Sequence, residues 1–260
     1  HDLMIISLES FYDLATGLEK LAIITDSPLE NNEGETLNAL SNGVQINFVD
    51  FSFEFELDKP LLKQVNLAIE KGAKIGVHGT QGSGKSIFLR MLTGNYTDFV
   101  GSLLINQIPI QNLNKSEYRK QVGTYLQGHE IFMGTLMENI TLGQTDISTD
   151  MIIQQANKLG FSNFLNYFPL GFDTLLDPMG KKLSESLKKK ILLIRATVGK
   201  KSLLLLEEPW NGLPNELQVK MKDYFLNELP NSTVIIATND AEYIQKCTVA
   251  FEIKNGVILD

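Results

Sequence analysis

The sequence Gly79-Thr80-Gln81-Gly82-Ser83-Gly84-Lys85-Ser86 sets the class of fold to which this chain belongs. It fits the pattern G-x-x-x-x-G-K-[ST], a phosphate-binding loop that connects a strand to a helix. The stretch 74–78 before it predicts a strand, and the apolar stretch 87–92 after it predicts a helix. Because this context is the one that the pattern requires, we expect a P-loop fold rather than a glycine-rich surface turn.

The chemistry of phosphate binding explains the residue types in this loop. Gly79, Gly82 and Gly84 allow the backbone to wrap with its N–H groups pointing inward. The helix that follows adds the positive end of its dipole. Lys85 can reach the β- and γ-phosphates of a nucleotide, and the hydroxyl of Ser86 can bind Mg²⁺. We therefore expect all eight residues of the loop to hold a nucleotide.

Two acidic residues follow an apolar strand further along the chain. Residues 203–206 are four leucines, and Glu207, Glu208 and Pro209 come directly after them. A P-loop hydrolase needs an acid at the end of a neighbouring buried strand, and a buried carboxylate is costly without a cation. We expect Glu207 to hold Mg²⁺ and Glu208 to orient or deprotonate the attacking water. The alternative is a strand end whose acids simply face solvent.

Gln127 follows another short strand, predicted at 124–126. Its amide can touch Mg²⁺ or the attacking water and sense the γ-phosphate. A glutamine at a strand end carries little information alone, so this assignment depends on its position relative to the loop and the acids.

The rest of the chain alternates strands with helices. Apolar or alternating runs predict strands at 44–53, 62–69, 202–206, 233–237 and 249–253, and a change of phase near Phe48 favours a bulge. Between residues 130 and 200 the pattern becomes mostly helical. This order predicts an α/β fold with a largely parallel sheet and a helical insertion.

The first 43 residues differ from this body. Apolar residues recur at helical spacing from Met4 to Leu18, and a polar stretch follows from Ser27 to Gly43. We interpret residues 1–43 as a linker helix and polar linker that lead from a missing upstream domain. A terminal helix packed on its own domain is the alternative. Because the first residue is His1, we expect the chain to be a piece of a longer protein.

Composition limits the possible functions. The net charge of −8 lies almost entirely in the N-terminal arm, so the body lacks the basic surface of a nucleic-acid-binding protein. One cysteine and three scattered histidines argue against a disulfide framework and against a cysteine- or histidine-based metal site. No apolar run approaches the ~18 residues that a membrane span needs. We expect a globular domain with no nucleic-acid partner.

Together these motifs resemble the ATP-binding domain of ABC transporters over residues 46–260. The phosphate loop, Gln127 and the Glu207–Glu208 strand end occur in that family's order. The run LQGHEIFMGTLMENI at 126–140 is similar to the exporter pattern Q-x-x-x-L-F-x-G-T-I-x-E-N-I, and GFDT at 171–174 is similar to G-Y-D-T. The resemblance implies a P-loop core with a mostly parallel sheet, an N-terminal antiparallel β subdomain and an inserted helical subdomain within residues 44–260. It also implies that adenine stacks on Phe53.

The chain departs from the family at groups that engage a second subunit. The signature L-S-G-G-Q, which caps the ATP of the opposite subunit, reads LSESL at 183–187. Ser184 is kept as an ATP contact, but Glu185 puts a carboxylate where an anion should bind. Asn239 stands at the position of the family's switch histidine. Asparagine can hydrogen-bond a phosphate oxygen but carries no charge. Glu207 replaces the usual aspartate. The lysines at 188–190 are interpreted as a solvated helix face.

The resemblance implies the cytoplasmic ATP-binding domain of a membrane exporter, with slow hydrolysis of ATP. Glu208 is the expected base, assisted by Gln127 and Asn239, and Mg²⁺ is assigned to Ser86, Gln127 and Glu207. The expected partners are the membrane-spanning domain of the same transporter and a second ATP-binding domain, which closes on the ATP and is the same chain or a different one.

Two alternatives to the exporter remain open. The first is a nucleotide-binding module with little or no turnover, which acts as a regulatory or structural half of a transporter. The second is a soluble ABC protein of DNA repair or translation. Measured hydrolysis separates the first from an active exporter domain, and a membrane domain encoded upstream would exclude the second.

Overall fold

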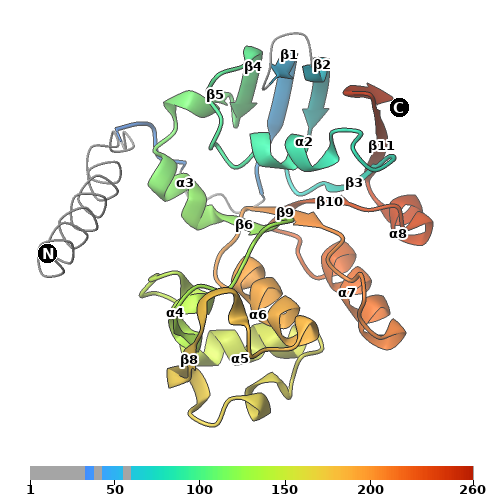
Figure 1. The fold of residues 1–260 in the computed structure, drawn as a ribbon. Helices are drawn as coiled ribbons and strands as arrows, with labels where there is room; N and C mark the ends of the chain where they lie inside the picture. Colours follow the sequence, from blue (N-terminus) through green and yellow to red (C-terminus); the bar gives the residue numbers. More distant parts are fainter. Residues whose placement is uncertain (1–32, 38–42, 55–59, 260) are drawn as a thin grey trace, which may run out of the picture. The chain divides into compact units, whose positions relative to one another are not determined.

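The computed structural model describes residues 33–37, 43–54 and 60–259 (Figure 1). The predicted N-terminal helix and most of the predicted polar linker lie outside these ranges. The described linker residues 33–37 contact the body of the chain, because Glu35 forms a β-bridge with Leu113 and Leu37 is buried in the core. None of the helices in these ranges has the length and hydrophobicity needed to cross a bilayer.

A six-stranded sheet with the order β12-β11-β3-β10-β9-β6 forms the centre of the fold. The neighbouring pairs from β11 to β6 are parallel, and only the edge strand β12 is antiparallel. The strands are β3 (Lys74–His78), β6 (Val122–Tyr125), β9 (Leu203–Glu207), β10 (Thr233–Ala237), β11 (Val249–Lys254) and β12 (Val257–Leu259). The predicted α/β class with a mostly parallel sheet is therefore confirmed.

Strand β9 divides its leucines between two hydrophobic cores. Leu203 and Leu205 belong to the core on one face of the sheet, and Leu204 and Leu206 belong to the core on the other face. All four side chains are buried. Because helices cover both faces, this strand reads as a continuous apolar run rather than as an alternating one.

A second sheet of four antiparallel strands has the order β2-β1-β4-β5. The strands are β1 (Ile46–Glu54), β2 (Pro60–Ile69), β4 (Val100–Ile105) and β5 (Ile108–Pro109). The pairing of β1 with β2 shifts register after Phe48, next to Asp50 with its positive φ of 46°. The predicted antiparallel subdomain and the bulge are both confirmed.

Helix α2 (Lys85–Met91), which begins in the phosphate loop, lies between the two sheets (Figure 1). Its fully buried Phe88 stacks on Phe48 of β1, with ring centroids 5.2 Å apart. On its other side the same ring meets Phe251 of β11 edge-on at 5.5 Å. The start of this helix, and with it the loop, is thus fixed by contacts to both sheets.

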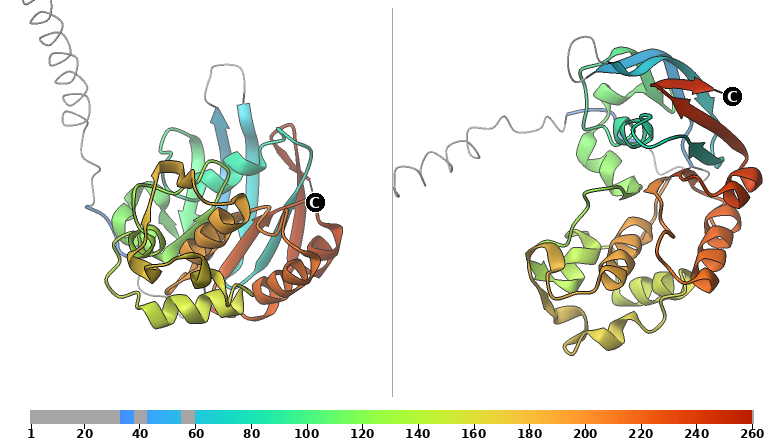
Figure 2. Two further views of the ribbon diagram at one scale, coloured as in Figure 1. Left: turned by 60° about the horizontal axis from the view of Figure 1, so that its bottom comes forward. Right: turned by 45° about the vertical axis from the view of Figure 1, so that its right-hand side comes forward.

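The helical segment lies on the face of the central sheet away from the four-stranded sheet, as the right-hand view of Figure 2 shows. It contains α4 (Leu136–Thr141), α5 (Thr149–Lys158), α6 (Glu185–Thr197) and the short strand pair β7 (Gly134–Thr135) and β8 (Leu175–Leu176). Short 3-10 helices occupy Phe164–Tyr167, Gly171–Asp173 and Pro178–Gly180. The remaining helices of the described chain are a 3-10 turn at Ile110–Asn112, α3 (Lys115–Gln121), α7 (Asn215–Asn227) and α8 (Ala241–Lys246). The predicted helical insertion is confirmed as part of the fold.

Gly123 of β6 permits a close contact between the central sheet and α6. A Cβ atom there would lie 1.8 Å from the carbonyl oxygen of Ala196. We expect Gly123→Ala to lower the free energy of unfolding by ~3 kcal/mol, because a backbone carbonyl cannot move aside as a side chain does. Chemical denaturation measures this loss. Gly76→Ala is the matched control in β3, where the nearest atom would be the side-chain sulfur of Cys247 at 3.2 Å. Equal losses in the two variants would contradict this account.

Candidate functional site

The phosphate loop joins the end of β3 to α2, and its glycines are required by geometry. Gly79 has a φ of 142°, and a Cβ there would lie 2.3 Å from the carbonyl oxygen of Ile253. Gly84 has a φ of 114°, and a Cβ there would lie 2.9 Å from the carbonyl oxygen of Leu61. A Cβ at Gly82, by contrast, would meet open space. Two glycines thus let the loop pass close to its neighbours, and the third faces outward.

Lys85 folds back over its own loop. Its Nζ donates hydrogen bonds to the carbonyl oxygens of Gly79 at 2.6 Å and Thr80 at 2.8 Å. Beside them, the buried hydroxyl of Ser83 is without a hydrogen-bond partner in the described part of the chain. A cation and an unpartnered hydroxyl at one loop are the groups that a bound phosphate would use, so the residues present fit a nucleotide phosphate.

Glu207 connects the loop to Gln127. The hydroxyl of Ser86 donates to Oε1 of Glu207 at 2.6 Å, and the backbone N–H of Gln127 donates to Oε2 at 3.1 Å. Gln127 is exposed and lies two residues beyond β6. Hydroxyl, carboxylate and amide oxygens are the hard ligands that Mg²⁺ prefers. The Ser86 hydroxyl and the Glu207 carboxylate therefore fit the predicted metal, and Gln127 contacts that carboxylate through its backbone.

Glu208 lies beside the end of β10, where Asn239 connects it to the phosphate loop. Its carboxylate accepts hydrogen bonds from the hydroxyl of Thr238 at 2.8 Å and from the backbone N–H of Asn239 at 3.3 Å. The side-chain oxygen of Asn239 in turn accepts from the backbone N–H of Gly79 at 3.1 Å. The structure thus brings six predicted site residues to one edge of the central sheet. They are Lys85, Ser86, Gln127, Glu207, Glu208 and Asn239.

Two predicted ATP contacts do not join this cluster. Ser184 is the N-cap of α6, where its hydroxyl accepts from the backbone N–H of Leu187 at 3.3 Å. Phe53 is only 4% exposed and meets Tyr96 edge-on at 5.4 Å. A ring that belongs to the core offers no free face to a base in this conformation. The stacking role of Phe53 stays a prediction that this geometry disfavours.

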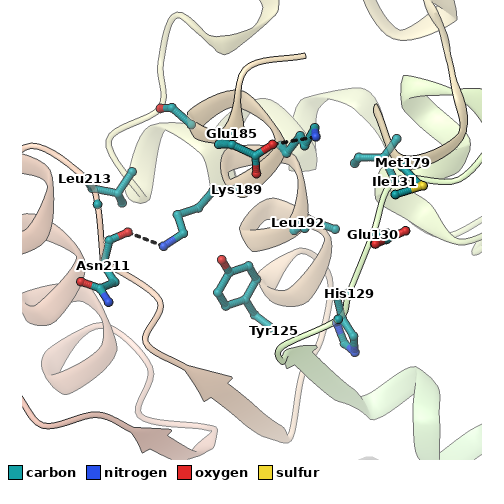
Figure 3. Close-up of a pocket in the computed structure, with 14 residues that line it drawn as sticks. Tyr125, His129, Glu130, Ile131, Met179, Glu185, Lys189, Leu192, Asn211 and Leu213 are labelled. Atoms are coloured by element: carbon teal, nitrogen blue, oxygen red, sulfur yellow. Dashed lines mark hydrogen bonds and ion pairs between the residues drawn. The ribbon is translucent and has the colours of Figure 1, made fainter. Parts of the chain in front are cut away.

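Lys189 makes contacts next to this cluster that the sequence interpretation missed. Its Nζ donates to the carbonyl oxygen of Asn211 and lies 5.6 Å from the ring centroid of Tyr125 (Figure 3). It also lies 3.5 Å from the carbonyl oxygen of Glu208. Partial burial lowers the pKa of Lys189, and the nearby Glu208 opposes that shift. The expectation of a solvated helix face at 188–190 is therefore wrong for Lys189, since α6 begins next to the loop after β9. A pocket of about 610 Å³ separates this lysine from His129 and Met179.

Comparison with known proteins identifies the family of the chain. The family model described as ABC transporter matches residues 62–211, which is more than half of the chain. A probable ABC transporter ATP-binding/permease protein of Haemophilus influenzae is 28% identical over 94% of this chain and 44% of its own length. ABC transporter B family member 22 of Arabidopsis thaliana is also 28% identical, over 94% of this chain and 20% of its own length. The chain belongs to the ABC transporter family.

A solved structure shows the same fold. It is described as a bacterial Atm1-family ABC exporter with ATP bound, and it superposes with a TM-score of 0.78 at 20% identity. The match covers 94% of this chain and 43% of the other. The chain thus spans less than half the length of these relatives. Domains of this family bind ATP, generally with Mg²⁺, and are generally ATPases.

Proposed function

We propose that this chain is the ATP-binding domain of an exporter, which binds MgATP and couples its hydrolysis to transport. The hydrogen bond of 2.6 Å between Ser86 and Glu207 carries this proposal. It joins the phosphate loop to the acidic strand end, although the two lie far apart in the sequence. The same carboxylate is held by Gln127. Phosphate-binding, metal-binding and water-activating groups thus share one edge of the sheet, as phosphoryl transfer requires.

The residues of this cluster have separate tasks. Lys85 exchanges its two loop carbonyls for phosphate oxygens, and Ser86, Glu207 and Gln127 hold Mg²⁺, which when bound offsets phosphate charge. Glu208 orients the attacking water and takes its proton. Asn239 supplies a neutral hydrogen bond near the γ-phosphate. Because it has no charge, we expect it to stabilise the transition state less than a histidine would.

The rest of the transporter is proposed from the relatives. The Haemophilus influenzae relative is called an ATP-binding/permease protein, and this chain covers under half of it. We therefore assign a membrane-spanning domain of the same transporter as the partner, with residues 1–43 as the connection. That assignment places this chain on the cytoplasmic face of the cell membrane.

Slow turnover is proposed from the segment around Ser184. Glu185, the first residue of α6, has an 89% exposed side chain whose carboxylate lies 2.7 Å from the ammonium of Lys188. An exposed ion pair of this kind offsets little of the charge. Facing the ATP of a second subunit, Glu185 would repel the γ-phosphate.

A different chain with an intact signature would therefore complete the site built on Lys85 and Glu208. A catalytically impaired regulatory half remains the second candidate.

Release of phosphate from MgATP tests the proposed ATPase. We expect the purified chain to release phosphate slowly, but at a higher rate than its Lys85→Ala variant. The rate of that variant gives the background. A rate equal to that background would favour the impaired module.

Association of the chain with itself tests the proposed partner. We expect a monomer in sedimentation velocity with MgATP, even in the Glu208→Gln variant, because two acidic signatures would face two ATP molecules. The matched control is Glu185→Gln combined with Glu208→Gln, which removes the charge and keeps the side-chain volume. A larger dimer fraction in this double variant would support the role of Glu185. A stable ATP-dependent dimer of the unmodified chain would contradict it and favour a homodimeric exporter.

A further inference from the structure

Thr238 supports the acid that the proposed mechanism uses as a base. The residue follows β10 and is fully buried, with 0% of its surface exposed. Its hydroxyl donates to Oε2 of Glu208 at 2.8 Å. Its backbone N–H donates to the carbonyl oxygen of Val77 at 2.9 Å, in the strand that leads into the phosphate loop. The Thr238 hydroxyl is thus held by the strand that leads into the phosphate loop.

The direction of this hydrogen bond is fixed by a second one. The backbone N–H of Asp240 donates to the hydroxyl oxygen of Thr238 at 3.2 Å. A hydroxyl has a single proton, and an ionised carboxylate can only accept. With an N–H already directed at its oxygen, Thr238 donates its proton to Glu208. This geometry defines one orientation of the carboxylate.

The side chain of Asn239 does not perform this task. Its contact with Gly79 at 3.1 Å must involve the amide oxygen, because the backbone N–H of Gly79 is a donor. Only the backbone N–H of Asn239 reaches Glu208, at the longer distance of 3.3 Å. Two consecutive side chains thus have different partners. The side chain of Asn239 contacts the phosphate loop, and the side chain of Thr238 contacts Glu208.

The main chain of Glu208 is fixed independently of this hydroxyl. Its N–H donates to the carbonyl oxygen of Ala237 at 2.9 Å, and its φ of 44° is left-handed. The ammonium of Lys189 lies 3.5 Å from its carbonyl oxygen. Removing the Thr238 hydroxyl therefore leaves the Glu208 backbone in place and allows the Glu208 carboxylate to rotate.

We propose that Thr238 is a positioning residue for Glu208, whose hydroxyl holds the carboxylate in the orientation that meets the attacking water. This inference rests on the proposed function, in which Glu208 is the base. Because its side chain is fully buried, Thr238 acts through Glu208 and does not itself take part in the reaction.

Steady-state hydrolysis by two variants of the full chain tests the inference. Thr238→Val keeps the shape and removes the hydroxyl, so we expect kcat to fall about 10- to 100-fold with KM unchanged, as for a misplaced catalytic group. Thr238→Ser keeps the hydroxyl, so its kcat should stay close to the unmodified rate. A Thr238→Val chain with unchanged kcat would overturn the inference, as would equal losses of kcat in the valine and serine variants.

A double-mutant cycle on thermal unfolding examines the contact without any need for turnover. Thr238→Val is compared in the unmodified chain and in a Glu208→Ala chain. In both chains, Thr238→Val also removes the hydroxyl oxygen that accepts from the Asp240 N–H. The effect of that loss on Tm is the same in both comparisons and cancels. We expect a larger fall in Tm when Glu208 is present. Equal falls would overturn the inference even in an active enzyme. If the unmodified chain neither binds nor hydrolyses MgATP, the proposed function fails, and the positioning role fails with it whatever the cycle shows.

Discussion

Glu208→Gln is expected to slow ATP hydrolysis by about 10²- to 10⁴-fold, the usual contribution of general base catalysis. Glutamine has nearly the shape of glutamate and can still accept the hydrogen bond that Thr238 donates at 2.8 Å. It cannot take a proton from water, however. Because Glu208 lies beside the phosphate loop and not within it, the affinity for MgATP should remain. Phosphate release gives the rate, and the MgATP-induced rise in Tm gives the binding.

Glu216→Gln is the control for this substitution. Glu216 is an exposed glutamate in the first turn of α7, and the change removes the same charge away from the loop. Its rate and its binding should both match those of the unmodified chain. A Glu208→Gln chain that hydrolyses ATP at the unmodified rate would exclude Glu208 as the base.

Lys85→Ala is expected to remove most of the stabilisation that MgATP gives to the chain. At a nucleotide concentration ~100 times Kd, binding should add about 2.7 kcal/mol to the free energy of unfolding. For a domain of this size, that gain raises Tm by several degrees. The ammonium of Lys85 is the cation of the loop, and it lies within 2.8 Å of two loop carbonyls. Without it, the loop retains N–H groups and the hydroxyl of Ser83 for phosphate, but no cation.

The measurement compares Tm with and without MgATP for each variant separately, because the substitution also removes two hydrogen bonds from the nucleotide-free chain. Lys63→Ala serves as the control, since Lys63 is an exposed lysine on β2. Its rise in Tm should equal that of the unmodified chain. A rise of the same size in Lys85→Ala would refute the assignment of the phosphate loop.

The sequence was sufficient to predict those strands that are buried on both faces. Thr233–Ala237 has the predicted bounds, because an uninterrupted apolar run is what a central parallel strand needs. The strand predicted at 124–126 was placed less well, since β6 runs from Val122 to Tyr125. Gly123 carries no apolar signal, and it belongs to the strand because β9 pairs with it and α6 packs against it.

The candidate site was predictable where it depends on local motifs. The phosphate loop and the two strand-end acids have residue types that phosphate and Mg²⁺ require, so they can be found without coordinates. Thr238 and Lys189 donate hydrogen bonds to partners 30 and 22 residues away in the sequence. Their roles depend on which strand ends and helix ends meet. Phe53 shows the opposite case, since its place in the sequence suggested a nucleotide contact and tertiary packing buried it.

The division of β9 between two cores has a consequence for cooperativity. One core contains the strands around α2, and the other contains the helical segment. Neither core can be taken apart without exposing two leucines of the strand that ends in Glu207 and Glu208. Melting of the helical segment is therefore linked to loss of the acidic strand end. Nucleotide held there would stabilise the distant helices as well, through a single shared transition.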